Sequence, residues 1–158
     1  MYKELQDYLI ALGTSHTDIT ATLLSHQLTK QQEYHSLTGS ILEIDGLTGK
    51  LSGQIGSSID ATQYLTISIG TLFKDSEKNN LTTEGYHRAL DISYTILFEF
   101  LAKLEHDLLA EECPIHTLDW GSVTTYEAEP TVNTWAAATA VIPYTIENVI
   151  NHNPLKWQ

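Results

Sequence analysis

Apolar and polar residues alternate along residues 63–73, and this alternation predicts a β-strand. A period of two in a segment rich in β-branched and aromatic residues is typical of a strand with one buried face. The face that we expect to meet a helix consists of Leu65, Ile67, Ile69, Thr71 and Phe73, and the other face consists of Tyr64, Thr66, Ser68, Gly70 and Leu72.

A helical period follows across residues 82–109, after the polar loop 74–80. Apolar residues recur there at spacings of four and three, which predicts one long amphipathic helix. Because the stripe covers only about three heptads, we expect it to pack into the core rather than into a coiled coil. The stripe consists of Leu90, Tyr94, Leu97, Leu101, Leu104 and Leu108, widened on one flank by Ala89, Ile96 and Phe100. The opposite face consists of Arg88, Asp91, Thr95, Glu99, Lys103 and His106, and in it we expect Glu99 to pair with Lys103.

Weaker patterns precede this strand and helix. Residues 2–12 show near-helical spacing, and we expect that helix to stop at Gly13. Residues 14–38 are polar and ambiguous: residues 19–28 could form a strand or a helical turn, and we assign neither. Residues 40–55 contain several glycines, which supply the positive φ of tight turns, so we expect short strands joined by such turns there.

The last third of the chain predicts two more strands, at residues 122–129 and within residues 133–149. The alanine run of the second segment resembles a helix, but the β-branched residues Val141 and Ile142 and the Tyr-Thr-Ile after Pro143 favour a strand. Because proline has no N–H to donate, we expect an edge position or a bulge at Pro143.

The order of these elements defines the expected fold class. One helix, two or three strands, a long helix and two further strands predict an α+β domain. We expect a single domain over residues 1–158, with an antiparallel or mixed β-sheet packed against one long helix and a short N-terminal helix.

Charge narrows the class of function. Eight Lys and Arg against 20 Asp and Glu give a net charge of −12, which argues against specific nucleic-acid binding. The N-terminal segment is acidic and amphipathic, so we expect no signal peptide. No apolar run is long enough to span a membrane, and the single Cys113 fits a reducing cytoplasm.

Seven histidines invite a metal hypothesis, but they are scattered along the chain. The arrangement nearest to a metal motif is Glu84 and His87 followed by Asp91, which would lie on one helical face. A metal site in a helical bundle needs matching motifs from other helices, and the sequence has no second copy. We therefore expect a solvated polar face and no metal ligand.

Other candidate chemistry is equally weak. Cys113 and His116 could form a nucleophile and base, but the neighbouring Glu111 and Glu112 oppose a thiolate. Glu127 and Glu129 share one face of a predicted strand, which is more typical of a solvated face than of general acid–base catalysis. The glycines at 46, 49, 53 and 56 lack the lysine of a phosphate-binding loop. We predict no catalytic and no cofactor-binding residue. Aromatic residues crowd the last third and could serve a core or an interface: Trp120, Tyr126, Trp135, Tyr144 and Trp157.

The order of elements over residues 65–150 resembles that of small phage virion proteins. The segment ISIGTLFKDSEKNNLTTEGYHRALDISYTILFEFLAKLEHD provides the strand, the acidic loop and the helix. Residues 122–127 and 134–146 take the places of the following strands, with Trp135 near the start of the second. Thr134 stands where those proteins have a glycine.

The resemblance implies a tail-terminator, tail-completion or neck-type protein. Such proteins are structural, carry no cofactor and form rings, commonly hexamers, that contact tail-tube or head-connector proteins. The resemblance further implies a cytoplasmic location during assembly and the virion afterwards. Two other classes stay open from the residues alone: a small-molecule-binding domain or enzyme, and an acidic adaptor or immunity-type protein that masks a basic partner.

Overall fold

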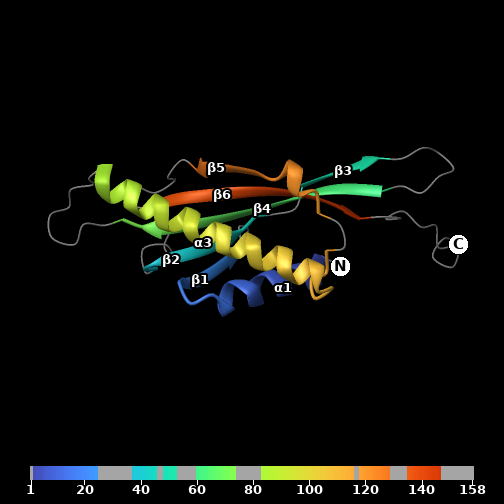
Figure 1. The fold of residues 1–158 in the computed structure, drawn as a ribbon, viewed down its shortest axis with the longest axis horizontal. Coiled ribbons are helices and arrows are strands. Elements are labelled where there is room, and N and C mark those ends of the chain that lie inside the picture. The colour runs from blue at the N-terminus through green and yellow to red at the C-terminus, as the bar shows by residue number, and fades with distance from the viewer. Residues whose placement is uncertain are drawn as a thin grey trace, which may run out of the picture.

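A computed structural model describes residues 2–24, 37–45, 48–52, 60–73, 83–115, 118–128 and 135–146. In these ranges the chain forms two α-helices, one short 3-10 helix and a six-stranded sheet (Figure 1). The elements are α1 (Tyr2–Ser15), β1 (Ile19–Leu24), β2 (Ser40–Ile44), β3 (Thr48–Ser52), β4 (Asp60–Leu72), α3 (Thr83–Leu109), η2 (Trp120–Ser122), β5 (Thr124–Ala128) and β6 (Trp135–Ile146).

The sheet is mixed, and its order is β1-β2-β4-β6-β5, with β3 paired to the first part of β4. Strands β1 and β2 run parallel, and the other neighbours run antiparallel. The predicted α+β class is therefore confirmed. Of the two kinds of sheet that the sequence left open, antiparallel or mixed, the structure has the mixed kind. The strands expected within residues 40–55 are β2 and β3, while β1 falls in the segment that supported no assignment.

The long strand β4 holds the sheet together because it pairs with β2, β3 and β6. Its alternation is as the sequence predicts: Leu65, Ile67 and Ile69 are buried on the face under the helices. Figure 1 shows α3 lying along the sheet, while β3 and the start of β4 extend beyond the helices. We call the face under the helices the inner face and the opposite one the outer face.

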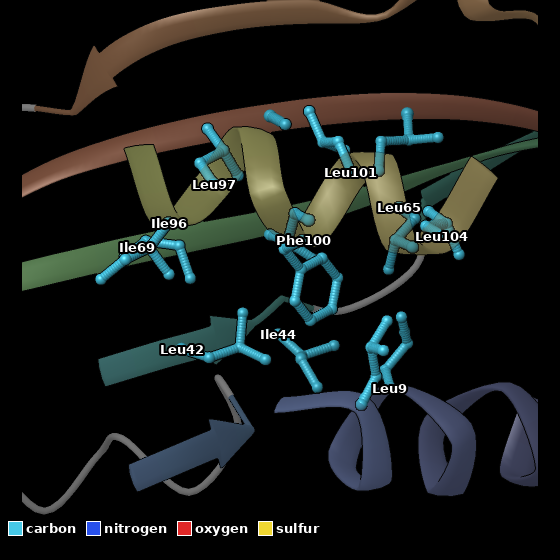
Figure 2. Packing of buried hydrophobic residues seen from close by; sticks show 14 of the residues in the cluster. Leu9, Leu42, Ile44, Leu65, Ile69, Ile96, Leu97, Phe100, Leu101 and Leu104 are labelled. Carbon is cyan, nitrogen blue, oxygen red and sulfur yellow. The ribbon is translucent and has the colours of Figure 1, made fainter. Parts of the chain in front are cut away.

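The core fills the space between α1, α3 and the inner face. Phe100 lies near its centre and points from α3 toward Ile44 of β2 and Leu9 of α1 (Figure 2). Its ring is 1% exposed, so it contributes the full burial of an aromatic side chain, roughly 2–3 kcal/mol. A continuous core between one helical layer and one sheet is the arrangement that an amphipathic helix and an alternating strand require.

Helix α1 continues to Ser15, past the glycine at which we predicted its end. A Cβ atom at Gly13 would lie 2.5 Å from Leu42 Cδ2 and 2.6 Å from Thr22 Oγ1. Gly13 therefore serves close packing of α1 on the sheet rather than helix termination. The prediction of the stop was wrong because spacing alone cannot distinguish a glycine that ends a helix from one that packs against a strand.

Helix α3 confirms the predicted long helix. Its buried face is not centred on the leucine stripe but lies toward the flank formed by Ala89, Ile96 and Phe100. Leu97, Leu101 and Leu104 are buried, whereas Leu90 and Leu108 are only half-buried. The buried face also includes two polar residues that the apolar pattern could not reveal, Ser93 and Asp107.

Ser93 belongs to a buried hydroxyl network at one end of the inner face. Its Oγ donates to the Ala136 carbonyl at 2.9 Å and lies 2.8 Å from Thr71 Oγ1. Ser40 Oγ lies 2.9 Å from the same Thr71 hydroxyl. Because buried hydroxyls are costly unless hydrogen-bonded, this network fixes how α3 sits across β2, β4 and β6.

The expected pair of Glu99 and Lys103 is replaced by other contacts. Lys103 Nζ binds Asp107 Oδ1 at 2.5 Å, and Glu99 Oε2 lies 3.1 Å from His16 Nε2. Lys103 thus pairs one turn toward the C-terminus of α3 rather than one turn toward its N-terminus, and of the two it is Glu99 that has a partner from a distant segment.

Strand β6 lies between β4 and β5 and is not an edge strand, but Pro143 itself occupies a position that β5 does not cover, as the expected edge position requires. Pairing with β4 continues through Pro143, which lies opposite Tyr64. Pairing with β5 ends earlier, where Thr124 lies opposite Val141. The proline is thus tolerated because it lies beyond the part of β6 that β5 covers.

The chain turns sharply at the end of α3. The Glu112 N–H donates to the Asp107 carbonyl at 2.9 Å and the Glu111 N–H to the Leu108 carbonyl at 3.2 Å. This pair of bonds is a Schellman motif, and it places Glu111 at φ 58°, in the left-handed region that usually takes glycine.

Candidate functional site

The residues nearest to a metal motif in the sequence, Glu84, His87 and Asp91, are exposed on α3. Glu84 Oε1 pairs with Arg88 at 3.3 Å, and the His87 ring lies 6.0 Å from the Tyr86 ring. Each contact is of the kind that a solvated helix face makes.

Cys113 lies in the core, and burial raises the pKa of its thiol. A raised pKa disfavours the thiolate, which is the nucleophilic form. His116, its predicted partner, lies outside the described residues. The described contacts of Cys113 are those of a core residue.

Glu127 accepts a hydrogen bond from the Tyr86 hydroxyl, which links β5 to the first turn of α3. Glu129, with which it was compared, lies outside the described residues, as do Gly46, Gly53 and Gly56. Gly49 lies in β3 opposite Gln63 of β4.

The aromatic residues of the last third serve different surfaces. Tyr144 is buried on the inner face and donates to Gln63 Oε1 at 2.8 Å. Trp135 is buried on the outer face, where its Cε3 lies 3.6 Å from the position of a Cβ on Gly70. Trp120 is half-buried, Tyr126 is exposed on the outer face, and Trp157 lies outside the described residues.

His16, Asp18 and Glu99 form a group that the sequence did not reveal, with one ligand atom from each within 4.8 Å of the others. The Asp18 N–H donates to His16 Nδ1 at 3.2 Å, so this ring nitrogen must be the unprotonated one in neutral His16. The ring proton then lies on Nε2 and points to Glu99. A cation would have to displace that proton and disturb the bond from Asp18, since metal-bound histidines normally donate through their other nitrogen. The described geometry is that of a tether from α1 to α3.

A second group surrounds the carboxylate of Asp107, which is 4% exposed. Tyr8 of α1 donates its hydroxyl to Oδ2 at 2.8 Å, while Lys103 and His106 Nδ1 approach Oδ1 at 2.5 and 3.2 Å. Burial by itself raises the pKa of this carboxyl, but the hydrogen bonds from Lys103, Tyr8 and His106 together hold the pKa below its usual value.

The same contacts act on Tyr8. Burial, followed by the hydrogen bond to Asp107, raises the pKa of the Tyr8 phenol far above its ordinary range, so Tyr8 stays a donor. The group ties α1 to the last turns of α3. Spacing along the sequence could not reveal that Tyr8 joins Asp107 or that Glu99 joins His16, because these pairs are 99 and 83 positions apart.

The remaining feature is a set of large apolar side chains exposed to solvent. On α3 they are Ile92, Phe98 and Leu109, the last of which is 80% exposed. On the outer face of the sheet they are Tyr64 and Tyr126. Since the inward side of α3 packs on the sheet, these two sets lie on opposite sides of the helix–sheet body.

The outer face is also poor in charge. Strands β4 and β6 present Tyr64, Thr66 and Ser68 next to Thr139 and Val141, and β5 adds Thr124 and Tyr126. Charge enters from the β2 side, where Glu43 lies opposite Ser68 and the exposed Asp45, directly after the strand, donates its N–H to the Thr66 carbonyl at 2.8 Å. Aromatic enrichment together with depletion of charge is a mark of protein interfaces.

Comparisons with known proteins leave the family open. The chain matches no family model and no curated protein. Among the described helices, none combines the length and the apolar character that a membrane crossing requires.

Proposed function

We propose that this chain is a structural, non-enzymatic subunit that assembles into a ring in a phage-type virion, at the head–tail junction or at the end of the tail. The observation that carries the proposal is the segregation of exposed large apolar residues onto two opposite surfaces, Phe98 and Leu109 on α3 and Tyr64 and Tyr126 on the sheet. A subunit that contacts a neighbour on each side needs two such surfaces.

Charge supports the same function. A net charge of −12 would let DNA pass through a ring without adhering, because fixed negative charge repels phosphates. The same charge disfavours contact between copies except where charge is scarce, as on the outer face of the sheet. The order of elements from residue 65 to 150, which resembles that of tail-terminator, tail-completion and neck-type proteins, supports the proposed class of ring.

Native mass spectrometry and negative-stain electron microscopy of the purified chain test the proposal. We expect a closed ring, with a hexamer as the leading stoichiometry, that binds a tail-tube or head-connector protein. A chain that stays monomeric at every concentration reached, with and without such a partner, would contradict the proposal.

The acidic adaptor is the second candidate, and the net charge of −12 is the observation that favours it. An adaptor that masks a basic partner should bind that partner tightly in low salt and much more weakly in high salt. Pull-down of basic proteins at two salt concentrations separates the candidates, because ring contacts through a charge-poor sheet face should be nearly salt-independent.

A further inference from the structure

We draw no further inference here: the strongest candidate, the pair of exposed apolar surfaces formed by Phe98 and Leu109 on the outward side of α3 and by Tyr64 and Tyr126 on the outer face of the sheet, carries nothing beyond the proposed function, because nothing in the described part of the structure shows what covers either surface.

Discussion

The inner and outer faces of the sheet are built by the same strands but differ in what determines their residues. On the inner face Leu65, Ile67 and Ile69 of β4 belong to the core and are at most 1% exposed. On the outer face the alternate positions of the same strand, such as Thr66 and Ser68, stay partly exposed. The inner face is therefore determined by packing within the chain. The outer face is packed in this way only in part, because Trp135 and Thr139 are buried there whereas Tyr64 and Tyr126 are exposed. Matched substitutions on the two sides test this difference.

The largest effect should come from two phenylalanines that lie two positions apart on α3. Phe100→Ala removes a ring from the centre of the core and should cost about 3–5 kcal/mol of unfolding free energy. Phe98→Ala removes an exposed ring and should change stability by about 0.5 kcal/mol or less, while weakening assembly. Urea unfolding of a dilute, monomeric sample measures both values. Equal losses would mean that Phe98 belongs to the core and not to an exposed surface of α3.

Asp107 is the buried charged residue on the inward side of α3, and its removal should have the next largest effect. Asp107→Asn weakens the hydrogen bonds from Tyr8 and Lys103, and we expect a loss of about 1–3 kcal/mol at neutral pH. Tyr8→Phe, which deletes one donor, should lose less than Asp107→Asn. Urea unfolding checks the ranking. If Asp107→Asn is more stable than the natural chain, the buried charge lowers the stability of the folded state.

The pH dependence of stability provides an independent check on Asp107. Its pKa is lower in the folded chain than in the unfolded chain, so the folded state binds this proton less readily. The carboxylate therefore contributes stability that is fully present above the unfolded pKa of about 4 and is lost as the pH falls through the lower folded pKa. We expect the stability of Asp107→Asn to fall less than that of the natural chain between pH 5 and pH 2, measured by thermal unfolding.

Alanine substitutions at two glycines test directly how crowded the two faces of the sheet are. A methyl group at Gly13 would meet Leu42 and Thr22 within 2.6 Å on the inner face, whereas one at Gly70 would meet nothing closer than 3.6 Å on the outer face. Gly13→Ala should cost about 1–2 kcal/mol, because overpacking exceeds the roughly 1 kcal/mol that alanine adds to helix propensity. Gly70→Ala should be neutral or stabilising by about 0.5 kcal/mol.

Thermal and urea unfolding of both alanine variants measure this difference. If Gly70→Ala proved as damaging as Gly13→Ala, the outer face would be as closely packed as the inner one. A folded Gly70→Ala chain that assembles poorly would instead indicate that a neighbouring copy approaches β4 closely.

The same contrast explains how much of the molecule could be predicted from the sequence. Period-two alternation in β4 and the 3.6-residue period in α3 arise from burial on one side, so Leu65, Ile67 and Leu104 were predictable. Strand β1 was not, because ITATLL is short and its pairing partner β2 lies farther along the chain. The contacts of Tyr8 with Asp107 and of His16 with Glu99 join distant residues, and no local pattern encodes them.

The smallest effect concerns the exposed Glu111 at the end of α3, where a residue with a Cβ holds a backbone conformation that usually takes glycine. Glu111 holds φ 58°, a conformation that costs a residue with a Cβ about 1–2 kcal/mol more than glycine. It also places a negative charge beside the negative end of the helix dipole. Glu111→Gly should therefore stabilise the chain by about 0.5–1 kcal/mol after the greater flexibility of glycine in the unfolded state is subtracted. Glu111→Gln, which removes the charge but keeps the Cβ, is the control and should gain less. Equal gains in urea unfolding would assign the cost to charge alone, and no gain from glycine would show that the turn at Glu111 is not strained.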